Sequence, residues 1–428
     1  ASPWQCCMMR GVGVGRAGKV LIIVENLPVP LDRRVWQEAR TLRDNGYTVS
    51  VICPVGGRYT QSYEMLEGIH IFRHPMPFEA DGAFGYLLEY CWALAWELTL
   101  SIRVQAKVGF DVVQACNPPD LMFLIAGFWK YLFGKRFVFD HHDINPELFE
   151  AKFNRRGFFH KLLTKLERWT FRTADVSIAT NETFKEIAVR RGGMSPERVF
   201  IVRSIPDVSR FRRVEPSTEL REGRRHLIGY VGIMGAQDGV DLLIEAVAEL
   251  VNGQGRRDVG CVIVGSGTEL PRLQRLAVER GVADHVTFTG FLSGEPLLKA
   301  LSSFDIGVIP DPKNTYNDKI SMNKAFEYMT LGIPFVQFDL MEGRKIAGDA
   351  ALYARDNSPA DLARQIARIM DNPKLASELA AEGRDRAKAL LRWDDEAARL
   401  LAAYDVALGT RQASSAARPV RPVATVGR

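Results

Sequence analysis

The chain has 428 residues, of which 46% are hydrophobic and 25% are charged, and its formal net charge at pH 7 is +5. A globular chain of this length exceeds one ordinary core, so we predict two domains of about 200 residues each. The net charge is too small for the dense basic patches of nucleic-acid-binding proteins, so we expect no nucleic-acid partner.

The positive excess lies in the first half of the chain. Up to Ile205 there are 26 Lys and Arg residues against 21 Asp and Glu, whereas the remainder has 30 of each kind. A mild positive bias of this kind suits an anionic membrane surface or a phosphorylated substrate. The six cysteines lack the spacing of a metal site or of disulfide pairs, which predicts a reducing, cytoplasmic setting.

The first half alternates short apolar runs with stretches of helical period. A helix is predicted in DRRVWQEARTLRDNG (32–46), directly after the first apolar run. Near-continuous apolar strands that alternate with helices indicate a parallel sheet covered on both faces. The predicted strands are residues 19–25, 48–54, 111–116, 136–143, 175–180 and 199–202.

The same alternation restarts in the second half, where VDLLIEAVAELVN (240–252) is the clearest helix. We therefore predict an α/β protein with two doubly wound, Rossmann-like domains that face each other across a cleft. The predicted strands of the second half are residues 226–235, 260–267, 285–291, 305–311 and 334–339.

The boundary between the domains is placed after Ile205, where a stretch rich in Pro and Arg begins. The Ala-, Ser-, Arg- and Pro-rich end of the chain has the composition of a disordered segment. The predicted parts are a flexible N-terminal extension (1–18), an N-terminal domain (19–205), a C-terminal domain (206–390), a C-terminal helix (391–408) and a disordered tail (409–428).

Glycines follow two strands of the second half, in YVGIMGAQDG (230–239) and VIVGSGTEL (262–270). Ligands of open parallel sheets bind at the carboxyl ends of the strands, and glycine lets the backbone approach a phosphate there. Gly235, Gly265 and Gly267 are therefore candidate donor-binding residues. Glycines also occur in ordinary tight turns at such places, but two turns in one half favour anion or nucleotide binding.

A third segment of the second half, KISMNKAFEYMTLGIPFVQFD, predicts a helix capped by Ser321 and followed by a strand. Its first turn holds Lys324, although acids are usual at the positive end of a helix. This lysine would make the helix end more attractive to an anion. The alternative is an ordinary pair between Lys324 and Glu327, one turn further on.

Two stretches of the first half bear on membranes. FGYLLEYCWALAWELTLSI (84–102) is long and apolar, but Glu89 and Glu97 would be costly at a bilayer centre, so we predict a buried or interfacial helix. RRGFFHKLLTKLERWTFR (155–172) mixes basic and apolar residues. It fits a helix lying on anionic lipid, and equally an amphipathic helix that packs on the sheet.

The motifs of the second half, GYVGIMGAQDGVDLLIEA, VIVGSGTEL, VTFTGF and MNKAFEYMTLGIPFVQFD, together resemble the donor-binding half of GT-B glycosyltransferases of family 4, over about Leu227 to Ala354. In the first half, ENLPVPLDRRVWQEARTLRDNGYTVSVICP and VFDHHDINPELFEAKF resemble the acceptor-binding half of family members that build bacterial exopolysaccharides and lipid-linked sugars. The resemblance covers nearly the whole chain.

The resemblance implies transfer of a sugar from a nucleotide diphosphate donor, with retention at the anomeric carbon and without an obligatory metal or other cofactor. It implies that Glu327 binds the donor ribose and that Phe291 and Leu292 hold the base through their backbone. His142 matches the histidine near the transferred sugar, with Asp143 beside it. The resemblance also assigns Asn323 and Lys324 to the donor site, and Arg33, Arg34 and His141 to the acceptor side.

The sequence departs from the family pattern at the donor diphosphate. Ile233 and Asp238 stand where an arginine and a lysine are common, and Lys319 replaces a second glutamate. The charge of the leaving diphosphate has to be met by fixed donors. The candidate replacements are Arg203, Lys313, Lys319 and Lys324.

These features predict a cytoplasmic glycosyltransferase, peripheral on the inner face of the plasma membrane, that uses a nucleotide sugar and a lipid-linked or glycan acceptor for cell-surface polysaccharide or glycolipid. Uracil is the base expected from family frequency, so the expected donor is a UDP-sugar. Two alternatives remain open: a nucleotide-sugar 2-epimerase of GT-B architecture, and a catalytically degenerate nucleotide-sugar-binding protein.

Overall fold

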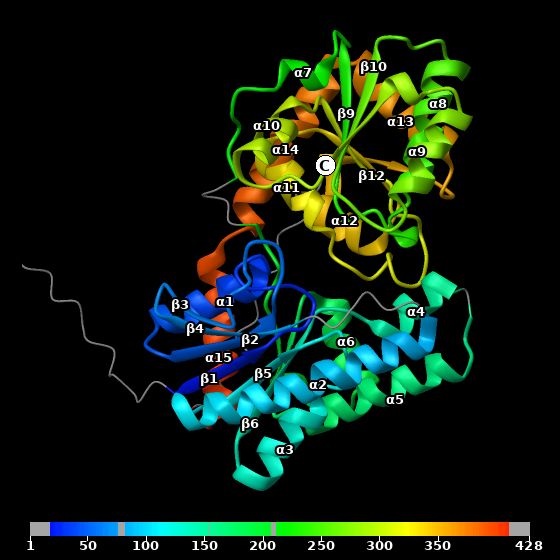
Figure 1. Cartoon of the computed structure of the whole chain (residues 1–428). Coiled ribbons are helices and arrows are strands. Elements are labelled where there is room, and N and C mark those ends of the chain that lie inside the picture. The colour runs from blue at the N-terminus through cyan, green and yellow to red at the C-terminus, as the bar shows by residue number, and fades with distance from the viewer. Residues whose placement is uncertain (1–17, 76–81, 154, 207–210, 411–428) are drawn as a thin grey trace, which may run out of the picture.

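The computed structural model describes residues 18–75, 82–153, 155–206 and 211–410, and for residues 82–90 it describes the backbone alone. Figure 1 shows two α/β domains, with the C-terminal domain uppermost. The predicted N-terminal extension (1–18) and disordered tail (409–428) lie outside the described residues, apart from residues 18, 409 and 410.

The N-terminal domain is built on one eight-stranded sheet. Its strands are β1 (Lys19–Ile23), β2 (Thr48–Pro54), β3 (Tyr63–Leu66), β4 (Ile69–His74), β5 (Val112–Cys116), β6 (Arg136–His141), β7 (Val176–Ala179) and β8 (Val199–Ile201). They lie in the order β3-β4-β2-β1-β5-β6-β7-β8, and each neighbouring pair is parallel except β3 and β4.

Helices cover both faces of this sheet. They are α1 (Arg33–Asp44), α2 (Gly82–Lys107), α3 (Phe123–Phe133), α4 (Asn145–Phe153), α5 (Phe158–Thr173), α6 (Glu182–Arg190), the short η1 (Pro196–Arg198) and α15 (Trp393–Leu408). Successive side chains of a strand point to opposite faces. Val20 and Ile22 of β1 pack with α1 and α15, whereas Leu21 and Ile23 pack with α2 and α3.

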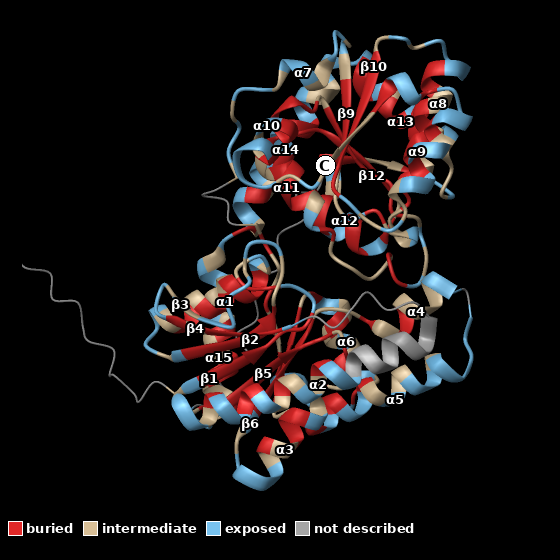
Figure 2. Cartoon of the chain, in the orientation of Figure 1, coloured by how far each residue is buried: buried red, intermediate tan, exposed pale blue. Residues whose placement is uncertain are grey.

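The C-terminal domain contains a six-stranded sheet that is parallel throughout. Its strands are β9 (His226–Val231), β10 (Val259–Val264), β11 (Val286–Gly290), β12 (Ile306–Ile309), β13 (Phe335–Phe338) and β14 (Ala351–Ala354). The order is β11-β10-β9-β12-β13-β14. In Figure 2 the strands of both domains are largely buried, as expected of parallel sheets between helix layers.

Residues of α8, α9 and α13 form one apolar cluster with this sheet, and residues of α10, α11 and α14 form another. The helical segments are α7 (Thr218–Arg221), η2 (Ala236–Asp238), α8 (Val240–Ala248), η3 (Glu249–Gly253), α9 (Leu270–Glu279), η4 (Ala283–His285), α10 (Gly294–Ser303), α11 (Asn323–Leu331), α12 (Met341–Ala347), η5 (Gly348–Ala350), α13 (Pro359–Asp371) and α14 (Pro373–Leu390). The prediction of two doubly wound domains is confirmed.

The C-terminal helix α15 returns to the N-terminal domain. Leu400, Ala403 and Tyr404 belong to the apolar cluster around β1 and β2, and Figure 1 shows α15 beside these strands. The helix predicted at residues 391–408 thus packs on the first domain. Its apolar residues bring the last described helix against the first strand, β1.

Three strands were not predicted. β3 and β4 form a hairpin around Glu67 and Gly68, both of which have positive φ. Two residues that include a glycine, between short β-rich runs, are the usual signal of such a turn. β14 is the edge strand of the second sheet, and two of its four residues (ALYA) are alanine, which is depleted in strands.

The two glycine turns of the second domain pack directly on each other. Gly265 has φ of +140°, and a Cβ built on it would lie 1.8 Å from the carbonyl oxygen of Gly232. A Cβ on Gly267 would lie 2.3 Å from the carbonyl oxygen of Met234. Close backbone packing therefore requires glycine at Gly265 and Gly267, whatever the turns bind.

We expect Gly265→Ala to lower the free energy of unfolding by about 3 kcal/mol or more, because it combines backbone strain with a steric clash. Urea titration followed by circular dichroism measures this. Gly157→Ala is the control, since Gly157 has negative φ and no atom within 4 Å of its Cβ position. Equal stability of the two variants would contradict the packing argument.

Candidate active site

Helix α11 begins at Asn323, and its N-cap is Met322, which makes no side-chain capping bond. The prediction that Ser321 caps this helix is wrong. The Ser321 hydroxyl instead accepts a hydrogen bond from Asn181 Nδ2 of the N-terminal domain, at 3.1 Å. No acidic residue lies in the first turn of α11, so the amide groups at this helix end keep their positive polarity.

Lys324 is paired inside the second domain. Its Nζ lies 2.7 Å from Asp311 Oδ2 and 4.8 Å from the ring centre of Tyr230. Burial opposes the charge of Lys324, but Asp311 and Asp238 outweigh it, so the pKa of this lysine is raised. The alternative partner, Glu327, is not the one observed. Lys324 offsets the charge of Asp311 before any ligand binds.

Glu327 lies one turn further along α11 and reaches the first domain. Its side chain is 10% exposed, and Oε1 lies 3.2 Å from Arg33 Nη1, at the start of α1. Burial raises the pKa of Glu327, although Arg33 and Lys324 pull the other way. Glu327 therefore lies where the two domains meet, beside an arginine whose side chain is 60% exposed.

The remaining predicted donor residues surround the carboxyl ends of β9, β10 and β11. The amide of Gly235 donates to Asp238 Oδ2 at 2.9 Å. Burial raises the pKa of Asp238 to about 6, against the opposing effect of Lys324. Phe291 follows β11 with 70% of its surface exposed, and Asn323 is exposed at the start of α11.

On the facing side, His142 is held by a buried carboxylate. Asp140 and His142 are two residues apart at the end of β6, so their side chains point to the same side of the sheet. His142 Nε2 lies 2.6 Å from Asp140 Oδ2, and Arg34 Nε lies 3.0 Å from the same nitrogen. A nitrogen so close to a carboxylate carries its proton, so Nε2 donates to Asp140 and accepts nothing from Arg34.

Arg34 fixes the position of that carboxylate. Arg34 Nη2 lies 2.8 Å from Asp140 Oδ1, and Nε lies 3.3 Å from Oδ2. Burial opposes ionisation of Asp140, yet Arg34 and His142 outweigh it and lower its pKa. Burial also opposes the imidazolium of His142, but Asp140 outweighs it and raises the pKa of His142. Arg34 was predicted on the acceptor side; in the structure it is buried in the ion pair with Asp140, so its side chain acts on the site through that carboxylate.

Asp140 also belongs to a buried chain that ends on α15. Gln114 Nε2 donates to Asp140 Oδ2 at 3.2 Å and to Glu38 Oε2 at 2.7 Å. The hydroxyl of Tyr404 donates to Gln114 Oε1. Sequence reasoning missed Asp140, although an acid two residues before the matching histidine was a usable signal. Nothing in the sequence indicated Tyr404, because its partner lies far away in the chain.

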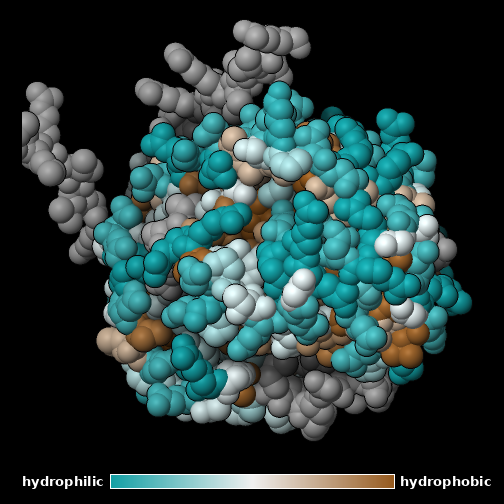
Figure 3. Space-filling view, turned by 90° about the horizontal axis from the view of Figure 1, so that it is seen from above, coloured by the Kyte–Doolittle hydropathy of each residue, from teal (hydrophilic) through white to brown (hydrophobic). Residues whose placement is uncertain are grey.

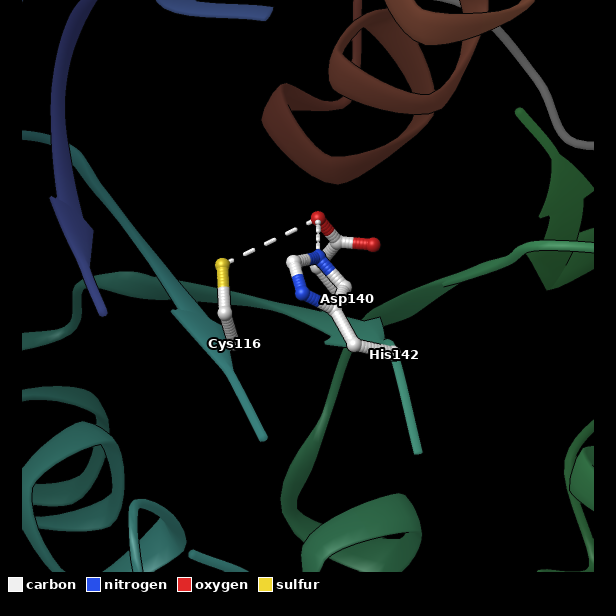
Figure 4. A group of neighbouring side chains, drawn as sticks. All are labelled: Cys116, Asp140 and His142. Carbon is white, nitrogen blue, oxygen red and sulfur yellow. Dashed lines mark hydrogen bonds and ion pairs between the residues drawn. The ribbon is translucent and has the colours of Figure 1, made fainter. Parts of the chain in front are cut away.

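Cys116, Asp140 and His142 place ligand atoms within 4.8 Å of one another, close enough for a metal ion. Figure 4 shows the contacts of Cys116 and His142 with the same oxygen of the Asp140 carboxylate. Arg34 occupies both oxygens of that carboxylate, and burial raises the pKa of the Cys116 thiol well above its usual range. A cation would have to displace Arg34 and deprotonate Cys116, so this donor set does not favour a metal.

Asp143 connects the two domains. Its Oδ1 accepts a hydrogen bond from the hydroxyl of Tyr316, at 2.8 Å, and its carbonyl oxygen accepts one from Asn117 Nδ2, at 2.6 Å. Tyr316 lies in the second domain and is almost fully buried. The residue next to His142 thus holds the end of β6 against the second domain, and Tyr316 is a site residue that the sequence did not indicate.

His141 lies in the core and not at the acceptor side, so that prediction is wrong. Between Asp140 and His142 on β6, it points to the opposite face of the sheet, where it packs within 5.3 Å of Phe139, Phe171 and Phe184, measured between ring centres. It is fully buried. The alternation of side chains along a strand makes neighbouring histidines face opposite layers.

The other candidate cations have partners of their own. Arg203 pairs with Glu396 of α15 at 3.2 Å, and Lys319 pairs with Glu147 of α4 at 2.9 Å. Lys313 is 57% exposed, and its Nζ lies 3.1 Å from the carbonyl oxygen of Asp339. Lys319 therefore contacts the first domain, whereas Arg203 binds the returning helix.

The predicted residues of both halves meet at the start of α1. Arg33 and Arg34 are consecutive, and they contact Glu327 of the second domain and Asp140 beside His142, respectively. The side chain of Asp32 caps this helix by accepting from Val35 N at 3.0 Å, which fixes where α1 begins. The start of α1 thus lies between Glu327 and the Asp140–His142 pair, and Glu327 and His142 are 185 positions apart in the sequence.

Two facing Rossmann-like domains with a returning C-terminal helix define the GT-B class. The pattern of the family described as "Glycosyltransferase Family 4" matches residues 31–210, and that of "Glycosyl transferases group 1" matches residues 225–372. The chain belongs to the family 4 glycosyltransferases of GT-B fold.

Two curated relatives come from Streptomyces kanamyceticus. The chain is 25% identical to a 2-deoxystreptamine glucosyltransferase and 26% identical to an alpha-D-kanosaminyltransferase, over 71% and 72% of this chain and 80% of each relative. Among solved structures, sucrose-phosphate synthase from Thermosynechococcus elongatus has a TM-score of 0.74 at 18% identity, covering 92% of this chain and 100% of that chain. HepE from Anabaena with UDP-glucose has a TM-score of 0.68 at 15% identity, covering 90% and 98%.

We expect Asp140→Asn to lower the pKa of His142 below the ordinary value of about 6.5, because the attraction of the carboxylate is lost while Arg34 stays close. In the native chain the raised pKa stabilises the fold fully below about pH 6.5, and this contribution is lost as pH rises through the folded-state pKa. NMR titration of the histidine ring signals measures the shift. His160, on α5, is the internal control, and an unchanged His142 would contradict the assignment.

Proposed function

We propose that this glycosyltransferase takes its sugar from a nucleotide diphosphate donor, a UDP-sugar in the first instance, and transfers it with retention to a lipid-linked or glycan acceptor. The observation that carries the proposal is that two consecutive residues at the start of α1 reach both groups: Arg33 contacts Glu327, and Arg34 lies beside His142. Groups that the family pattern assigns to donor ribose and transferred sugar thereby lie on opposite sides of one domain boundary.

The residues of each domain at this boundary have chemistry suited to their proposed roles. Glu327 is a carboxylate that can accept hydrogen bonds from two neighbouring ribose hydroxyls. The start of α11 provides amide groups for the diphosphate, whereas the Gly235 amide is occupied by Asp238. His142 donates through Nε2 to Asp140, and an imidazole near neutral pH can orient the reacting sugar. Phe291 and Leu292 follow β11, where their backbone can hold the base.

The proposed reaction has no obligatory metal or other cofactor. Fixed positive groups can meet the charge of a leaving diphosphate, and in this chain the start of α11 provides amides whose polarity no first-turn acid reduces. Lys324 shares its charge with Asp311 and Asp238, so it contributes less to the diphosphate than an unpaired lysine would.

We expect the protein to transfer or slowly hydrolyse a labelled UDP-sugar, and Glu327→Ala to weaken UDP-sugar binding roughly tenfold or more, because a charge-assisted hydrogen bond is lost. Calorimetry with UDP-, GDP- and ADP-sugars measures affinity, and NMR of the product gives the anomeric configuration. Glu342→Ala, on the neighbouring α12, is the matched control. Inversion at C2 of the sugar would indicate the epimerase, and binding without turnover would indicate the degenerate protein.

The acceptor is proposed to be membrane-bound, with the enzyme at the inner face of the plasma membrane. None of the described helices combines the length and apolarity needed to span a bilayer. Exposed apolar side chains gather on helices of the first domain: Leu124, Tyr131, Leu132, Phe133, Phe158, Phe159, Leu162 and Trp169. The top of the C-terminal domain, seen in Figure 3, is predominantly hydrophilic by contrast.

Helix α5 combines this apolar surface with charge. Phe158 is 74% exposed and Phe159 is 53% exposed, so the first turn of α5 does not pack on the sheet. Lys161 and Lys165 lie on the same helix, exposed to solvent. Apolar side chains flanked by lysines suit an anionic lipid surface. A small cyclic polyol acceptor is the second candidate, because one Streptomyces relative bears the name 2-deoxystreptamine glucosyltransferase.

We expect the protein to co-sediment with vesicles that contain anionic phosphatidylglycerol, and this binding to weaken with salt. Replacing Phe158 and Phe159 by Ser should reduce binding roughly tenfold or more, because two aromatic side chains no longer enter the lipid. Val278→Ser, an exposed apolar position on α9 of the second domain, is the control. Binding that is absent, or equal in the double variant, would contradict the proposed surface.

A further inference from the structure

Arg33 extends from the first domain to the second. It is the first residue of α1, and its Nη1 lies 3.2 Å from Oε1 of Glu327 on α11. Its guanidinium carbon lies 5.7 Å from the ring centre of Phe211, in the segment that joins the domains. Because 60% of the side chain is exposed, the arginine can change its torsions without unpacking the core.

The partner of Arg33 distinguishes it from the other cations near the site. Lys324 holds the buried Asp311, Lys319 holds Glu147, and Arg203 holds Glu396. Moving Lys324 would leave the buried Asp311 unpaired, which is costly. Glu147 and Glu396 also pair with Arg191 and Arg399, so Lys319 and Arg203 belong to ion-pair clusters that lie away from Glu327. Arg33 instead holds Glu327, the carboxylate that the proposed function assigns to the donor ribose.

We propose that Arg33 supplies the positive charge for the donor diphosphate from the opposite domain. The inference rests on the proposed function. When the ribose hydroxyls donate to Glu327, they replace Arg33 as its partner, and the released guanidinium binds the adjoining phosphates. Arg33 then has two successive anionic partners, Glu327 in the free enzyme and the diphosphate in the complex.

The chemistry of transfer requires such a charge. The bond between the anomeric carbon and the β-phosphate oxygen breaks, and its electron pair leaves with the nucleoside diphosphate. The acceptor hydroxyl oxygen bonds to the anomeric carbon, and its proton leaves with the diphosphate or passes to water. The leaving group gains negative charge, and a guanidinium can bind phosphate oxygens with two parallel hydrogen bonds.

The second domain lacks this charge at its glycine turn. Ile233 is 70% exposed there, at the place where the family pattern has an arginine. Asp238 replaces a lysine, and its carboxylate accepts the Gly235 amide. An acid at this turn repels a diphosphate and occupies one of the amides that could bind it. A cation from the first domain offsets both effects, and it makes donor binding draw the two domains together.

The test compares a nucleotide with its nucleoside. Calorimetry on the full chain measures affinity for UDP and for uridine in the native protein, in Arg33→Ala and in Arg33→Lys. We expect Arg33→Ala to bind UDP roughly tenfold to a hundredfold more weakly, the effect of losing a charge-assisted hydrogen bond. Uridine affinity should stay equal or rise, because Glu327 no longer has a competing partner. Arg33→Lys should bind UDP with intermediate affinity.

Arg40→Ala is the matched control, because Arg40 lies on α1 and pairs with Glu67, away from α11. The inference is overturned if Arg33→Ala binds UDP as the native protein does, or if UDP and uridine affinities change by the same factor. Equal changes for UDP and uridine would mean that Arg33 only holds the two domains together through its ion pair with Glu327. If the native chain binds none of UDP, GDP and ADP, the proposed function is contradicted, and the role of Arg33, which rests on it, is contradicted as well.

Discussion

The buried ion pair between Arg34 and Asp140 is the interaction on which the rest of the site depends. Arg34 binds both oxygens of the carboxylate, and the carboxylate in turn binds His142. Both groups are buried, so removing either charge would be costly, although Glu38 remains a partner of Arg34 and His142 remains a partner of Asp140. The pair also fixes α1 against β6, and α1 carries the neighbouring Arg33 to the domain boundary. The contact between Arg34 and Asp140 thus sets the positions of His142 in the first domain and of Arg33 at the domain boundary.

Contacts at the boundary show how the two α/β domains form one site. Tyr316 donates to Asp143, Lys319 pairs with Glu147, and Arg33 pairs with Glu327. Each joins a side chain of one domain to the end of a strand or helix of the other. Partly exposed pairs such as Arg33 and Glu327 contribute little to stability, about 0 to 1 kcal/mol. Replacing Arg33 by a ligand as the partner of Glu327 therefore costs little free energy. Replacing a partner in the buried Arg34–Asp140 pair would cost much more.

The returning helix α15 adds a constraint of a different kind. Tyr404 reaches Gln114 beneath the Asp140 carboxylate, and Glu396 binds Arg203 near the end of the first domain. The last described helix therefore supports the polar layer under His142, although it follows the second domain in the chain. The geometry around His142 therefore depends on residues near both ends of the described chain.

The sequence by itself determined the two parallel sheets, because apolar strands that alternate with helices can be buried only in this way. It also predicted the helix and the strand around Glu327, because their segment is contiguous in the sequence. Only the tertiary structure decided which charges pair: Lys324 with Asp311, Arg33 with Glu327, and Arg34 with Asp140. These partners lie 13 to 294 positions apart, and no local pattern encodes such contacts. The two histidines show the same limit, since the pleat of β6 turns His141 into the core and His142 toward the site.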